Sequence, residues 1–524
     1  MIGVGIFRAD VLPSPKDIHP SGRSEVFVPQ PASGPENRFL RPLYSGPFQV
    51  FQPSDTRPDD GDKPAGWPDE GYDVIRNPAI VRAANGNLVV VADGRVSDGP
   101  GHDSGSCDLV SRVSSDDGET WSETVIVSTM ESPEGNGKRE THAHHALVTA
   151  PNGDILLVFS VERWGTRRQG RCFVLRSRDH GVTWEEPEDI GYLIPFADGT
   201  EKTWATTKLI DDNWDHEARG GFPESRSDGS SLEPGDYVIA SDGDRYEFTG
   251  FDWKVGIRWF SWGAGNGIVH SDGSVIFIVA INRHAAVMRS VDDGQTWTVG
   301  PRTSAPIFES DPVELSNGDI MTIGRSAHYM TRTTSSWPGI YPAEDADMLH
   351  WFKDREGNDW KAGGRRVIHR GPNLQRVVIF SPDGQTIKNV YDHTALVAPI
   401  SNVSTINITE APDPHIIAFG SPVPTEEDMR FTNHIGFLPR DRSSAPWTIR
   451  LSYDDGKTWP VQRVVPDVQN QSKLVNLGGG EFGVVSEYAP NQPGYGVQFV
   501  SFSIGWLLKY DPLDPGLPEG ETGY

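Results

Sequence analysis

The stretch SVDDGQTW, residues 290–297, decides the fold, because the chain carries the same pattern four times. The other copies are SSDDGETW at 114–121, SRDHGVTW at 177–184 and SYDDGKTW at 452–459. In each copy the Asp can accept hydrogen bonds from nearby backbone N–H groups, the Gly two residues later supplies a positive φ, and the Trp packs between sheets. The motif therefore predicts a tight β-hairpin turn that recurs along the chain.

A second repeat counts the structural units. A turn leads into an apolar strand six times, in NGNLVVVAD (85–93), NGDILLVFS (152–160), DGSVIFIVA (272–280), NGDIMTIGR (317–325), DPHIIAFGS (413–421) and GGEFGVVSE (479–487). Six strands of one type predict six blades, and regular long-period repetition favours radial closure over a β-sandwich. We therefore expect an all-β fold, a six-bladed β-propeller of four-stranded antiparallel blades.

The turns and the chain ends complete the predicted ring. Blades 1, 2, 3 and 5 end in clear copies of the hairpin motif, and FSPDGQTI (380–387) is an altered copy that serves blade 4. The last blade is expected to combine VQFVSFSI (497–504) with an N-terminal strand near PFQVFQP (47–53). A strand from one end of the chain would then close the ring on the other.

The composition agrees with short strands and limits the function. The chain has 56 Gly, 41 Pro and 16 Trp, and only 36% of its residues are hydrophobic, which favours turns and strands over helical bundles. Its net charge of -26 repels nucleic acid phosphates and anionic membrane surfaces. A few arginines in a cleft can still attract an anionic sugar, so the charge excludes a nucleic-acid partner but not an acidic glycan.

No metal, cofactor or membrane span is expected. Cys107 and Cys172 cannot form a disulfide framework and have no metal-ligand spacing around them. The acidic hairpin motif is too short for a calcium loop and lacks the later Glu of an EF-hand. The chain shows no Sec signal pattern and no run of about 18 apolar residues, which predicts a soluble protein and leaves its compartment open.

Changes in composition along the chain predict its domain limits. Residues 1–45 are rich in Pro, Gly and Ser and are expected to form an N-terminal extended segment. The propeller is expected over 46–510, with the polar, acidic stretch 211–256 as an insertion at a blade edge and 511–524 as a C-terminal tail.

Candidate site residues come from the register of the innermost strands, which converge on the axis of a propeller. Counting back nine residues from the turn Gly of blades 1, 2 and 4 gives Asn77, His144 and Glu309, which we take as equivalent positions. The basic residues that approach the same face are Arg76, Arg95 and Arg325. Taken singly, an Arg is usually a solvated surface charge and an Asp before a strand a turn former.

Several segments resemble the sialidase family. The hairpin motif is similar to the Asp-box of sialidases, and RNPAIV (76–81) to their RIP-type motif. The similarity covers about 72–508, and its further segments are ADGR (92–95), HDSGSCDLVSRVSSDDG (102–118), WFSWGAGNGIV (259–269), FESDPVELSNG (308–318) and TIRLSYDDGKTWP (448–460). The resemblance implies a glycan substrate with an acidic terminal sugar.

The resemblance also implies roles for individual residues. It implies an arginine triad for a substrate carboxylate, made of Arg76, Arg325 and Arg442, with Arg440 as a possible substitute for the last. Two residues more separate Arg442 from its Asp-box than in the usual pattern. Planar guanidinium forks suit that task. Arg95 would bind substrate as well, and Glu487 corresponds to the Glu that braces the first arginine.

The implied chemistry departs from the family at one position. Asp103 corresponds to the acid/base and Glu309 to the partner that polarises the nucleophile. The nucleophile of sialidases is a Tyr, but aligning 471–487 places Gln471 there. A neutral amide has no accessible oxyanion at pH 7, so Gln471 can contact substrate but cannot form a covalent glycosyl-enzyme.

The sequence is compatible with three functions. The first is an exo-glycosidase for a terminal sialic acid or related 2-keto-3-deoxy sugar acid, working without the usual Tyr. The second uses His144 of the run THAHHALV (141–148) as the base of a polysaccharide lyase on uronate glycans, although such a His can equally be a core residue. The third is a glycan-binding propeller without catalysis.

Overall fold

The computed structural model describes residues 43–52, 72–96, 105–130, 139–162, 171–190, 201–206, 233, 235–239, 245–254, 265–281, 284–303, 307–326, 352–353, 374–397, 402–408, 416–423, 446–488 and 496–508. Within these ranges the chain is built almost entirely of antiparallel strands, and the one α-helix there is α3 (Ile504–Leu507). No helix in this part of the chain is long and apolar enough to cross a membrane.

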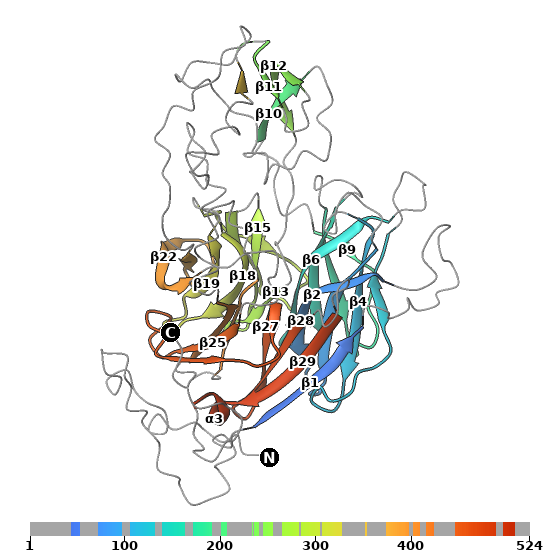
Figure 1. Ribbon diagram of the computed structural model, residues 1–524, viewed down its shortest axis with the longest axis vertical. Helices are drawn as coiled ribbons and strands as arrows, with labels where there is room; N and C mark the ends of the chain where they lie inside the picture. Colours follow the sequence, from blue (N-terminus) through green and yellow to red (C-terminus); the bar gives the residue numbers. More distant parts are fainter. Residues whose placement is uncertain are drawn as a thin grey trace, which may run out of the picture.

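The strands form six consecutive blades (Figure 1). Blade 1 has β2 (Val74–Arg82), β3 (Leu88–Arg95), β4 (Cys107–Ser114) and β5 (Val125–Ser128), and blade 2 has β6 (Thr141–Thr149), β7 (Ile155–Glu162), β8 (Arg171–Ser177) and β9 (Glu188–Asp189). Blade 3 has β14 (Ile268–Val269), β15 (Val275–Ile281), β16 (His284–Ser290) and β17 (Thr298–Val299). Blade 4 has β18 (Ile307–Glu314), β19 (Ile320–Ser326), β21 (Leu374–Phe380) and β22 (Ile387–Val397). Blade 5 has β23 (Ser404–Asn407), β24 (Ile417–Pro422), β25 (Trp447–Ser452) and β26 (Val461–Val464).

Blade 6 closes the ring with strands from both ends of the chain. It contains β27 (Gln469–Gly478), β28 (Glu481–Tyr488), β29 (Gly496–Ser503) and β1 (Tyr44–Phe51). β1 pairs antiparallel with β29, so the predicted closing strand is confirmed, although it starts at Tyr44 rather than near residue 47. The innermost strands contact one another in order around the axis, and the short strand β13 (Gly265–Asn266) pairs in parallel with β6.

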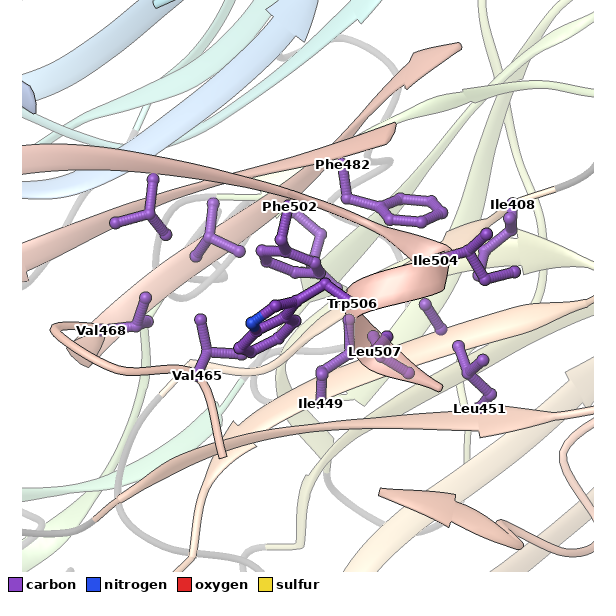
Figure 2. Close-up of a cluster of buried hydrophobic side chains, with 14 of the residues drawn as sticks. Ile408, Ile449, Leu451, Val465, Val468, Phe482, Phe502, Ile504, Trp506 and Leu507 are labelled. Atoms are coloured by element: carbon purple, nitrogen blue, oxygen red, sulfur yellow. The ribbon is translucent and has the colours of Figure 1, made fainter. Parts of the chain in front are cut away.

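Each pair of neighbouring blades shares its own apolar cluster. The second strand of a blade is buried on both faces, as in β3, where all eight residues are buried, because a blade is covered by a neighbour on either side. This double coverage is why those segments are continuous apolar runs. Figure 2 shows the cluster between blades 5 and 6, where Phe482, Phe502 and Trp506 pack against Ile449 and Leu451.

The Asp-box turns have the geometry that their sequence predicts. In the third copy, Ser290 Oγ accepts from Gly294 N at 2.8 Å and donates to Asp292 Oδ1 at 2.7 Å, and Asp292 accepts from Thr296 N at 2.9 Å. These hydrogen bonds to the ionised form lower the pKa of Asp292 against the opposing effect of its partial burial. The altered copy of blade 4 keeps the turn, since Ser381 Oγ bonds Asp383 at 2.5 Å.

The box Gly is required by conformation and by space. Gly118 has a φ of +94°, and a Cβ there would lie 2.3 Å from a ring carbon of Phe499 in blade 6. Gly273 in blade 3 also has a positive φ, of +84°, but a Cβ there would meet nothing within 4 Å. The two positions therefore separate backbone strain from steric overlap.

We expect Gly118→Ala to lower the free energy of unfolding by about 2–5 kcal/mol, and Gly273→Ala by about 1–2 kcal/mol. Both substitutions carry the left-handed strain of about 1–2 kcal/mol, and Gly118→Ala adds overpacking of about 1–3 kcal/mol. Denaturant titration of the two variants beside the wild type measures the difference. Equal losses would show that Phe499 moves aside at no cost.

A separate sheet lies outside the six blades. It contains β10 (Glu201–Thr206), β12 (Arg245–Lys254), β11 (Tyr237–Ile239) and β20 (Phe352–Lys353), and Figure 1 shows β10, β11 and β12 at the top of the view, away from the blades. The excursion therefore starts before the predicted limit of 211, because β10 pairs with β12 and not with a blade. Most of the predicted N-terminal segment and the whole predicted tail lie outside the described residues.

Candidate functional site

The innermost strands of four blades carry a bulge at the same place. The register shifts by one residue between Arg76 and Ala79 in β2 and at the matching places in β6 and β18, and by two residues between Gln469 and Ser472 in β27. The second residue of each bulge has a positive φ, and these residues are Asn77 (+51°), His144 (+56°), Glu309 (+48°) and Asn470 (+49°). The predicted equivalence of Asn77, His144 and Glu309 is thus confirmed, and blade 6 contributes a fourth member.

The second strands present one residue beside each bulge. In the strand register of blade 1, Asp93 lies opposite Arg76, and in that of blade 6, Glu487 lies opposite Gln469. The same position is occupied by Ser160 in blade 2 and Arg325 in blade 4. Because β-bulges redirect side chains, this register brings charged residues from several blades to one end of the inner strands.

Arg76 is held by Glu487 across the junction of blades 6 and 1. Arg76 Nε lies 3.1 Å from Glu487 Oε1 and Arg76 Nη2 lies 3.4 Å from Glu487 Oε2, so the ion pair is bidentate. Asn77 N also donates to Glu487 Oε1, at 2.9 Å. The Glu487 side chain is fully buried and the Arg76 side chain is 15% exposed, so the guanidinium is held against a buried carboxylate while part of the side chain reaches the surface.

Asp93 is the centre of a second buried group, between blades 1 and 2. Its Oδ2 accepts from Asn77 Nδ2 at 2.8 Å and from Arg95 Nη2 at 2.7 Å, and His145 Nδ1 lies 3.2 Å from its Oδ1 without the alignment of a hydrogen bond. Burial opposes ionisation, but Arg95 and His145 outweigh it and lower the pKa of Asp93 to about 2. Arg95 itself is 5% exposed, so the structure places it in this buried group.

Blades 4, 5 and 6 are tied together at the axis by a buried ion pair and its hydrogen bond. Lys473 Nζ of blade 6 lies 2.8 and 2.9 Å from the two carboxylate oxygens of Asp311 in blade 4, and it donates to Val403 O beside blade 5 at 2.7 Å. Both side chains are fully buried. Glu309 and Gln471 each lie two residues before a member of this pair, so the pair fixes the strands that carry them.

Gln471 is placed next to the blade 6 bulge and is mostly buried. Its residue is 8% exposed, and its Oε1 has no hydrogen-bond partner within the described part of the chain. Glu309 is half-buried on the corresponding bulge of β18. A carboxylate and an amide acceptor therefore occupy corresponding parts of blades 4 and 6.

The histidine run of β6 divides into two kinds of residue. His142 is buried and its Nδ1 lies 2.9 Å from Ser128 Oγ, and His145 is fully buried beside Asp93 with Nε2 3.1 Å from Val91 O. His144, on the bulge, is only half-buried. Of the three, His144 alone has the exposure that contact with a ligand requires.

Several predicted site residues are not placed. Asp103, Arg440 and Arg442 lie outside the described residues, and for Arg325 the main chain is described in β19 but the side chain is not. Their assignments remain predictions. In the described ranges no group of three or more His, Cys, Asp and Glu could hold a metal ion.

Four residues of the site were not predicted from the sequence, namely Asp93, His145, Asp311 and Lys473. The repeats contained a signal for Asp311, which is the first paired residue after the bulge of blade 4. The equivalent residues are Ala79 in blade 1 and Ala146 in blade 2. An acidic side chain where equivalent strands have Ala indicates a special contact.

The chain is similar to proteins that have been named sialidases. Residues 86–199 match the model of the BNR repeat-like domain family. A sialidase of Micromonospora viridifaciens is 26% identical over 382 residues, which cover 69% of this chain and 51% of that protein. This chain thus spans about half the length of that relative.

Solved structures show the same fold. The sialidase of Trypanosoma rangeli has a TM-score of 0.54 at 14% identity, covering 90% of this chain and 61% of that one. The NanB sialidase of Streptococcus pneumoniae has a TM-score of 0.51 at 13% identity, covering 88% of this chain and 71% of that one. At these identities the likeness concerns the propeller fold.

Proposed function

We propose that this chain, a sialidase-like β-propeller with BNR repeats, is a glycoside hydrolase that releases a terminal acidic sugar from a glycan. The observation that carries the proposal is Arg76, an arginine whose partly exposed side chain is held in place by a fully buried carboxylate. A fixed planar fork of this kind is suited to a sugar carboxylate. The sugar would be a sialic acid or a related 2-keto-3-deoxy sugar acid.

The other predicted residues take roles around that carboxylate. Arg325 and Arg442 would complete its binding with Arg76, and Asp103 would protonate the leaving oxygen. Arg95 lies next to Asp93 in the buried group, close in sequence to Asp103, and would support substrate at that edge. Since Arg76 and Arg325 belong to blades 1 and 4, the substrate would span the axis.

Gln471 determines how the sugar would be displaced. An amide at this position cannot form a covalent intermediate, so water would attack the anomeric carbon directly. Glu309 would take the proton of that water, while the glycosidic bond breaks and Asp103 supplies a proton to the leaving group. The buried Oε1 of Gln471, which has no hydrogen-bond partner among the described residues, would accept a hydrogen bond from the water or the sugar.

Incubation of the chain with fluorogenic glycosides tests the proposal. We expect release of fluorophore from at least one α-ketoside of an acidic sugar, and none from glycosides of neutral hexoses, because only the acidic sugar has a partner for Arg76. A panel of sialic acid and 2-keto-3-deoxy sugar acid donors, with neutral glycosides as controls, covers the class. Failure to turn over any acidic donor would overturn the proposal.

His144 favours one alternative function, that of a lyase acting on uronate glycans. As a half-buried histidine at the position equivalent to Glu309, it could abstract a proton next to a uronate carboxylate, which makes the reaction a β-elimination. Elimination gives an unsaturated product that absorbs ultraviolet light, whereas hydrolysis does not. Absorbance rising on uronate glycans would select the lyase, and binding to a glycan array without any product would select a binding protein.

A further inference from the structure

Two buried acids occupy the same position in adjacent blades. Glu487 of blade 6 and Asp93 of blade 1 are each the second-strand residue paired beside the inner-strand bulge. Each also contacts the bulge of the blade that follows. Glu487 accepts from the backbone N–H of Asn77, and Asp93 lies against His145, the residue after His144.

The contacts of these acids form one continuous chain through three blades. Asn77 donates its backbone N–H to Glu487 at 2.9 Å and its side-chain amide to Asp93 at 2.8 Å. Asp93 continues to His145 at 3.2 Å, and His145 is anchored to Val91 O at 3.1 Å. The bulges of blades 1 and 2, which lie on neighbouring strands β2 and β6, are therefore joined through a single carboxylate.

We propose that Asp93 is a positioning residue that fixes the bulges of blades 1 and 2, and with them the orientation of Arg76, Arg95 and His144 toward the ligand. The inference rests on the proposed function for its activity readout. Asp93 is fully buried, so it acts through these residues and not by touching the sugar. Removing an anchor of this kind misplaces side chains by fractions of an ångström, which is enough to slow a reaction.

The charge of Asp93 is stable over the working range of an enzyme. Its folded pKa of about 2 lies below the ordinary value of 3.8, so the carboxylate contributes stability above that ordinary value and loses the contribution only as the pH falls through about 2. The anchor is thus ionised at any pH at which the glycosidase would operate.

Asp93→Asn tests the proposal, because it keeps the shape and removes the charge. We expect kcat to fall by about 10- to 30-fold through misplacement, whereas KM for the acidic glycoside should stay the same or fall by up to about 3-fold. The fall in KM follows from removing a buried negative charge beside arginines, which strengthens their attraction for an anion. Partial unfolding cannot lower KM.

Leu175→Ala is the matched control. Leu175 is buried in the cluster between blades 1 and 2, on the third strand, away from the bulges. Its truncation should lower the melting temperature as much as Asp93→Asn or more, yet leave kcat and KM of the folded protein unchanged. If Asp93→Asn behaves as Leu175→Ala does, Asp93 has only a structural role and the proposal is wrong.

If the chain turns over no acidic glycoside, a crystal structure of Asp93→Ala still measures whether Asp93 positions the bulges. In that case the proposed function fails, but the anchor still predicts that the main chain at Asn77 and His144 moves by more than about 0.5 Å relative to wild type. Bulges that superpose within that limit would overturn the positioning role independently of any activity.

Discussion

Lys473→Met is expected to lower the free energy of unfolding by about 3–5 kcal/mol. The substitution leaves the Asp311 carboxylate fully buried without its cation, and an uncompensated buried charge is far more costly than the pair. It also removes the bond to Val403 O, so blades 4, 5 and 6 lose a common tie. Guanidinium titration measures the change.

Two variants control for this result. Asp311→Leu with Lys473→Met removes both charges, and we expect it to regain most of the lost stability, since an apolar pair of similar size often replaces a buried ion pair without loss. Lys388→Met breaks the ion pair between Lys388 and Asp319. The Lys388 side chain is 45% exposed, so this change should lower the free energy of unfolding by no more than about 1 kcal/mol. A double variant as unstable as the single one would show that the charges are not the cause.

The fold could be predicted from sequence because its determinants are local and repeated. An Asp-box turn is specified within eight residues, by a hydroxyl, a carboxylate and a Gly such as Gly294 whose φ is +79°. The second strands are apolar on both faces, which marks each blade. Six local signals in sequence order allow few arrangements other than radial closure.

The candidate site could be predicted only in part, because its support comes from contacts between blades. The fixed distance from turn to bulge gave Asn77, His144 and Glu309 by counting. Asp93 and Lys473 gave no such signal, since a charged residue in a strand usually faces solvent and only the three-dimensional arrangement shows its buried partner. The spacing of residues along one blade does not indicate which residues of the next blade they contact.

Arg76→Ala is expected to lower kcat/KM for an acidic glycoside by about 100- to 10,000-fold. A guanidinium that holds a carboxylate makes two charge-assisted hydrogen bonds, each contributing about 1.5–3 kcal/mol, and every 1.4 kcal/mol corresponds to a factor of ten. Because Arg76 would bind the sugar both before and during displacement, KM should rise as well as kcat fall. Initial rates over a range of substrate concentrations separate the two.

Two further variants separate the role of Arg76 from a general loss of charge. Arg178→Ala removes an Arg from the exposed Asp-box turn of blade 2, where the side chain is 63% exposed, and should leave kcat/KM unchanged. Glu487→Gln keeps an acceptor for the Asn77 N–H but removes the ion pair with Arg76, so it should lower kcat/KM less than Arg76→Ala does. Combining Glu487→Gln with Arg76→Ala should add little to the loss from Arg76→Ala alone, because both changes act on one contact. Fully additive losses would mean that Glu487 affects activity by a route other than Arg76.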